Sequence, residues 1–83
     1  MNKGKRIPPS LDKLTRSEMA LVIKESRLDS LNEDIAEMYL LEGMFQIDIA
    51  ADTGVTRRTV HRRLDEIFPR LESTAERMHI NSA

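Results

Sequence analysis

The sequence predicts an all-α protein, a small domain of four to five helices that contains a helix-turn-helix. Apolar side chains recur at helical spacing, two capping-box patterns mark helix starts, and no stretch alternates with the period of a β-strand. Only 4% of the 83 residues are aromatic, so the core must consist of Leu, Ile, Val, Met and Ala. A domain of this size is expected to be stable by only about 3–5 kcal/mol.

A helix is expected over about residues 15–26. Thr15 and Glu18 have the spacing of a capping box, in which the hydroxyl accepts from a backbone amide and the carboxylate reaches back to the first residue. Apolar residues then follow at helical spacing and predict a buried face, formed by Met19, Val22 and Ile23.

A second helix is expected over about residues 31–42. Ser30 and Glu33 have the spacing of another capping box. Gly43 suits the C-terminus of this helix, because glycine readily adopts a left-handed conformation.

The second half of the chain predicts a short helix over about residues 46–52 and another that starts at Thr56. An apolar stripe runs along the second of these helices through Val60, Leu64, Ile67 and Leu71. Pro69 lies inside the stripe, and it either kinks the helix or begins a new one.

Residues 46–66 have the spacing of a helix-turn-helix, in which two helices cross steeply over a tight turn. Ala50 offers the small side chain that a close crossing needs, and Gly54 offers the positive φ that the turn needs. Thr56 can cap the second helix. The inner faces receive their aliphatic side chains from Ile49, Val55 and Val60.

Charge is segregated along the chain, although the net charge is only −1. Residues 17–52 contain two basic and nine acidic side chains, whereas residues 53–63 contain four arginines and no acid. The chain is therefore not a general binder of polyanions, because its middle would repel phosphate. It could hold nucleic acid through one local basic surface.

The helix after Thr56 has two different faces. On a wheel of about 100° per residue, Val60, Leu64 and Ile67 share one face, and Arg58, His61, Arg62 and Asp65 share the opposite one. This pattern is typical of a recognition helix, which presents long donors to base edges. The alternative is a solvated basic face on an ordinary amphipathic helix. We expect base contacts from Arg57, Arg58, His61 and Arg62, and phosphate contacts from Gln46 and Arg63.

The stretch from Leu14 to Glu72 resembles the TrfB/KorA-type repressors of bacterial plasmids. The shared features are Leu14-Thr15-x-Ser17, Ile35-Ala36, Leu41-x-Gly43-x-x-Gln46, Ala50 and Gly54-x-Thr56-Arg57-x-x-Val60. The resemblance implies an all-helical repressor that binds a palindromic operator as a homodimer, with Thr56 and Arg57 contacting DNA. Arg62 stands where a family member carries Gln, which implies guanine rather than adenine readout. The sigma-factor region that reads the −35 promoter element is a weaker resemblance.

Three regions are expected along the chain: a flexible basic arm at 1–10, the DNA-binding domain at 11–68 and a C-terminal helical segment at 69–83. The arm carries Lys3, Lys5 and Arg6, and it either reaches the minor groove or is merely a soluble terminus. The C-terminal segment carries an apolar stripe, which either forms the homodimer contact or packs over the domain's own core. This stripe consists of Leu71, Ala75 and Met78.

The sequence therefore predicts a double-stranded DNA-binding transcriptional repressor with residues 56–65 in the major groove. The alternative is a protein-interaction module or polymerase-associated regulator that uses the acidic surface of residues 17–52. We expect no enzyme activity, metal, cofactor or small-molecule effector, since no catalytic constellation or phosphate-binding glycine loop is visible. Cysteine is absent and no apolar run suits a membrane span or signal peptide, so a cytoplasmic setting is expected.

Overall fold

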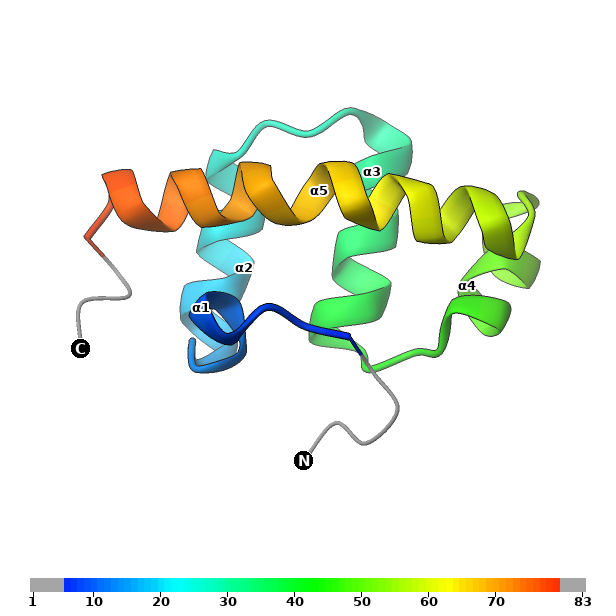
Figure 1. Cartoon of the computed structure of the whole chain (residues 1–83), viewed down its shortest axis with the longest axis horizontal. Coiled ribbons are helices and arrows are strands. Elements are labelled where there is room, and N and C mark those ends of the chain that lie inside the picture. The colour runs from blue at the N-terminus through cyan, green and yellow to red at the C-terminus, as the bar shows by residue number, and fades with distance from the viewer. Residues whose placement is uncertain (1–5, 80–83) are drawn as a thin grey trace.

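The protein is all-α, as predicted, in a computed structural model that describes residues 6–79 (Figure 1). The elements of this range are α1 (Pro9–Asp12), α2 (Arg16–Glu25), α3 (Ser30–Ala36), a π-helical turn (Glu37–Leu41), α4 (Gln46–Thr53) and α5 (Arg57–Arg77). The described range contains no strand. The long helix α5 lies across α2 and α3, while α4 packs near its N-terminal end (Figure 1). α1 was not among the expected helices, and it begins with Pro9, whose missing N–H costs no hydrogen bond at that position.

Side-chain caps define where α2 and α3 begin. The Glu18 amide donates to Thr15 Oγ1 over 3.1 Å and the Thr15 amide donates to Glu18 Oε1 over 2.9 Å, which confirms the first capping box. The second capping box is wrong by one residue, because Asp29 caps α3 and Ser30 is its first residue. The Asp29 carboxylate accepts from the Asn32 amide over 2.8 Å, and its charge is favourable at a helix N-terminus.

The segment after α3 turns the chain toward α4. The π-helical turn ends where the Glu42 amide donates to the Glu37 carbonyl over 3.0 Å. Gly43 follows with φ of 71°, the left-handed conformation expected at this helix end. The Met44 amide then donates back to the Met38 carbonyl over 2.9 Å, and α4 starts two residues later.

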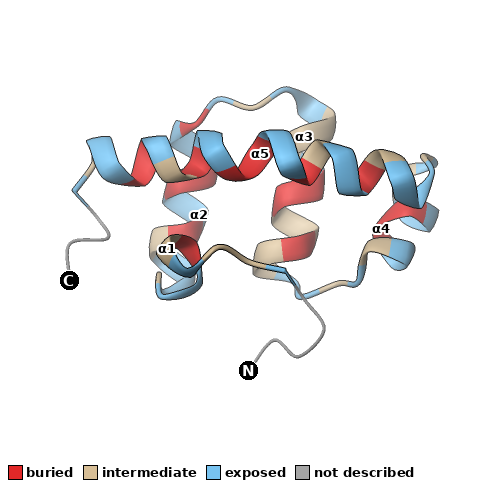
Figure 2. Cartoon of the chain, in the orientation of Figure 1, coloured by how far each residue is buried: buried red, intermediate tan, exposed pale blue. Residues whose placement is uncertain are grey.

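The buried face of α5 forms one wall of the core, and α1, α2, α3 and α4 all contact this helix (Figure 2). The fully buried aliphatic residues of α5 are Val60, Leu64, Ile67, Leu71 and Ala75. Each large aliphatic side chain that is buried in this way contributes about 1.5–3 kcal/mol relative to an exposed one. Because one helix supplies all five, the position of α5 is fixed along most of its length.

The expected boundary between residues 68 and 69 does not interrupt the fold, because α5 runs through Pro69 without a break. Pro69 has no N–H to donate to the carbonyl four residues earlier in the helix. Because Pro69 is exposed, water can donate to that carbonyl instead. Leu71 and Ala75 pack into the chain's own core, which was one of the two roles left open for the C-terminal stripe. These two side chains are therefore not available to a second copy. Residues 80–83 lie outside the described range.

The segment expected to be a flexible arm at 1–10 is docked from Arg6 onward. The Arg6 amide donates to the Tyr39 hydroxyl over 2.9 Å, and that hydroxyl donates to the Arg6 carbonyl over 3.0 Å. The buried Tyr39 thus binds both the amide and the carbonyl of Arg6. No sequence pattern predicts this contact. Lys3 and Lys5 lie outside the described residues.

Replacing Gly54 with alanine is expected to lower the free energy of unfolding by about 1 kcal/mol. Gly54 ends α4 with φ of 81°, and its amide donates to the Ala50 carbonyl over 2.9 Å. No heavy atom lies within 4 Å of an added Cβ, so the cost comes from backbone strain alone. Gly54→Asn is the control, and it should cost less because asparagine tolerates the left-handed region. Equal urea midpoints for the parent, Gly54→Ala and Gly54→Asn would contradict this reasoning.

Candidate nucleic-acid interface

The α4–α5 junction holds its predicted residues in the expected conformations. Gly54 is left-handed, Ala50 is buried, and Thr56 is the N-cap of α5. Thr56 Oγ1 accepts from the Thr59 amide over 3.1 Å, which fixes where α5 begins. Only three residues separate the two helices, so α4 and the start of α5 must lie close together.

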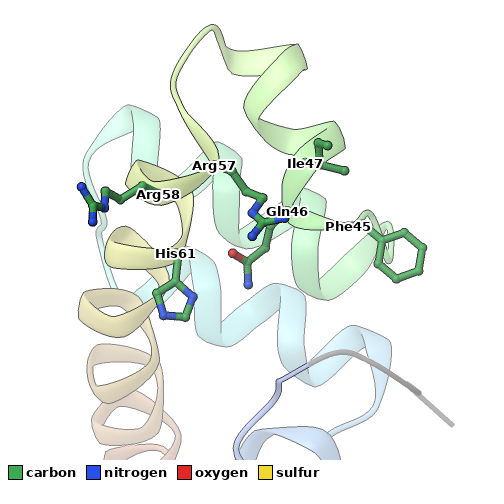
Figure 3. A pocket seen from close by; sticks show the side chains of 6 residues that line it. All are labelled: Phe45, Gln46, Ile47, Arg57, Arg58 and His61. Atoms are coloured by element: carbon green, nitrogen blue, oxygen red, sulfur yellow. The ribbon is translucent and has the colours of Figure 1, made fainter.

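An open groove of about 670 Å³ lies between the N-terminal end of α4 and the first turns of α5 (Figure 3). It is lined by Phe45, Gln46, Ile47, Arg57, Arg58 and His61. The side chains of Arg57 and Gln46 point toward each other, whereas Arg58 points to the other side of α5 (Figure 3). Four of the seven predicted site residues thus line one groove, although the end of the Arg58 side chain is directed away from the other three.

The arginines at the start of α5 are exposed and carry no ion pair with any residue that the structure describes. Arg57, Arg58 and Arg62 are absent from every salt bridge found within residues 6–79. The partial positive charge of the α5 N-terminus adds to theirs. Asp48 and Asp52 are exposed on α4, but neither lines the groove. This end of the molecule is thus a local cationic surface on a chain of slightly negative net charge.

Arg63 occupies a different position from the other three arginines. Its guanidinium donates to Asn32 Oδ1 over 3.0 Å and lies 3.6 Å from Asp29 Oδ2, and its side chain is only 27% exposed. This contact ties α5 to the start of α3. Arg63 was expected to touch phosphate, but its donors are directed to the acidic middle of the chain, so we leave it out of the interface.

Asp65 lies at the edge of the cationic surface and connects it to the N-terminal segment. Its Oδ2 is 3.8 Å from His61 Nε2, and its Oδ1 is 2.9 Å from Nη1 of Arg6. The helical wheel places Asp65 on the basic face of α5, but nothing in the sequence indicates that Arg6 reaches it. Arg6 was expected on an arm that either reaches the minor groove or is a soluble terminus, and its contact with Asp65 is what sequence reasoning missed.

Two exposed apolar side chains were also missed at the start of α4. Phe45 is 55% exposed and Ile47 is 61% exposed, and both line the groove. A sequence signal existed for Ile47, since it stands two positions before the buried Ile49 and so lies about 200° away around the helix. Apolar groups in a cationic groove suit contact with the methyl group of thymine.

Comparisons with family models, with curated proteins and with solved structures gave no significant match. Among residues 6–79, no helix combines the length and the apolar character that crossing a bilayer requires. The same residues contain no group of three or more His, Asp or Glu side chains arranged to hold a metal ion. The interpretation of the site therefore depends on its own geometry and charge.

Proposed function

We propose that the chain is a sequence-specific, double-stranded DNA-binding transcriptional repressor in which α4 and α5 form a helix-turn-helix. One observation carries this proposal: the exposed arginines Arg57, Arg58 and Arg62 have no acidic partner among residues 6–79, while the opposite face of the same helix is fully buried. A helix anchored in this way can enter the major groove, which is about 12 Å wide. The resemblance to the TrfB/KorA-type repressors supports the same function.

The proposed contacts follow from the chemistry of the side chains. Arginine presents a planar fork that matches O6 and N7 of guanine, so Arg57, Arg58 and Arg62 would read guanine or hold the backbone. His61 lines the same groove and would add a base contact. Gln46 opens α4 and would donate to phosphate beside the free amides of that helix.

Sequence specificity requires two copies of the chain. One recognition helix covers about four base pairs, so two copies on half-sites about 34–36 Å apart would read a palindrome. The buried Leu71 and Ala75 cannot form the contact between copies, so the homodimer would use another surface or assemble on the DNA. Repression would be steric, through coverage of promoter DNA in the cytoplasm.

Salt dependence tests the proposed function. We expect binding of a labelled duplex to weaken steeply between 50 and 200 mM salt, because each phosphate contact adds about 0.9 to the slope of log K against log salt. A chain that is folded by circular dichroism but binds no duplex at 50 mM salt contradicts the proposal. Binding of a basic protein under those conditions would instead support an interaction module that uses the acidic surface.

Adjacent arginines provide a matched pair of variants. Arg62→Ala is expected to relax base preference at one position, at a cost of about 1–3 kcal/mol in binding, and to leave stability unchanged. Arg63→Ala is expected to keep base preference and to lower stability by roughly 1 kcal/mol, because it removes the contact with α3. The measurements are affinity for a panel of single-base variants and a urea midpoint. A change of base preference in Arg63→Ala would show that the assignment is reversed.

A further inference from the structure

We propose that Arg6 is a phosphate contact of the DNA-binding surface, and that Asp65 is its internal competitor. In the protein without DNA, Asp65 and Arg6 form an ion pair, with Asp65 Oδ1 2.9 Å from Nη1 of Arg6. In the complex, a phosphate of the duplex replaces that carboxylate. This inference rests on the proposed function, and it names a residue outside the helix-turn-helix that takes part in it.

Arg6 is held in place by contacts that do not involve Asp65. The Tyr39 hydroxyl bonds both the amide and the carbonyl of Arg6. The guanidinium carbon lies 5.2 Å from the centroid of the Phe68 ring, which is within the range of a cation–π contact. Loss of the carboxylate would therefore leave the guanidinium at the same place, ready for another anion.

The position of Arg6 extends the cationic groove. His61 lines the groove and lies 3.8 Å from Asp65, and Asp65 in turn contacts Arg6. A duplex backbone that leaves the groove past His61 would meet this pair next. A phosphate at that place would compete with the Asp65 carboxylate for the Arg6 guanidinium.

The ion pair between Arg6 and Asp65 allows a phosphate to replace the carboxylate. The side chains of Arg6 and Asp65 are 44% and 55% exposed, so water reaches both and the attraction between them is weak. Carboxylate and phosphate oxygens accept from the same guanidinium fork. In the parent, the negative charge of Asp65 beside this contact offsets the positive charge that Arg6 brings to phosphate, so the pair adds almost nothing to net counterion release.

Replacing Asp65 should make the contact of Arg6 with phosphate measurable in a salt titration of the full chain. Asp65→Asn is expected to bind duplex about three- to tenfold more tightly at 50 mM salt, with a slope steeper by about 0.9. The steeper slope corresponds to an additional loss of about threefold between 50 and 200 mM salt. Glu76→Gln is the control, since it removes one negative charge from an exposed position near the far end of α5. It should change affinity less than about twofold and leave the slope unchanged.

A second variant separates a phosphate contact from simple screening of Asp65. In the Asp65→Asn background, Arg6→Gln is expected to return the slope to that of the parent, because the gained contact is lost. If Arg6 only screened the charge of Asp65, Arg6→Gln would have no effect once Asp65 is replaced by asparagine. The proposal is overturned if Asp65→Asn keeps the parent's slope, or if Arg6→Gln changes nothing in that background. Failure of the parent to bind any duplex would instead overturn the proposed function itself, and this inference with it.

Discussion

Replacing Arg57, Arg58 and Arg62 together with alanine is expected to weaken binding to the preferred duplex at least about 100-fold while the chain stays folded. Loss of each base contact costs about 1–3 kcal/mol, so the combined loss is at least about 100-fold in affinity. The three side chains are exposed and make no ion pair within residues 6–79, so the fold does not depend on them. Fluorescence anisotropy measures the affinity, and circular dichroism measures the fold.

A control with the same change of net charge shows whether position matters. Lys13, Lys24 and Arg77 are exposed on or beside α1, α2 and the C-terminal end of α5, the end of the molecule away from α4 (Figure 1). Alanine at these three positions is expected to weaken binding only slightly, through the long-range field. If this control lost as much affinity as the first variant, binding would reflect overall charge and not a local interface.

Leu64→Ala is expected to leave most of the chain unfolded at 25 °C. Leu64 is fully buried on the face of α5 that forms the core, and deletion of a buried leucine side chain costs about 2–5 kcal/mol. That loss is comparable to the whole stability expected for a domain of this size, about 3–5 kcal/mol. Leu64→Met is the control, since it conserves volume and should cost less than about 1.5 kcal/mol. Urea denaturation curves of the two variants and the parent decide the matter, and superimposable curves would refute the expectation.

Local patterns were sufficient to predict most of the helices. The start of α2 was read correctly because a capping box is a contact between residues three positions apart. The αL conformation of Gly54 followed from the turn that the spacing requires. Pro69 remained ambiguous, because a proline inside a helix costs about 3 kcal/mol and only tertiary packing can offset it. That packing comes from Leu71 and Ala75, whose partners on other elements a sequence pattern does not identify.

The candidate site was only partly predictable, because its missing members depend on contacts between distant elements. A helical wheel already separates Arg62, which lies opposite the apolar face, from Arg63, which lies about 60° from it. Only the structure shows that Arg63 reaches Asn32 on α3. The contact of Arg6 with Asp65 joins the N-terminal segment to α5, and no periodicity predicts it. Residues that point outward from one helix could thus be predicted, whereas pairings across the fold could not.

Selection of bound duplexes from a random-sequence pool tests DNA recognition by the chain most directly. The purified full chain is incubated with the pool at low salt, and the retained duplexes are sequenced after several rounds. We expect two inverted half-sites of about four base pairs, guanine-rich where the arginines read, with centres about 10–10.5 base pairs apart. A retained pool with no common motif would contradict sequence-specific recognition by α5.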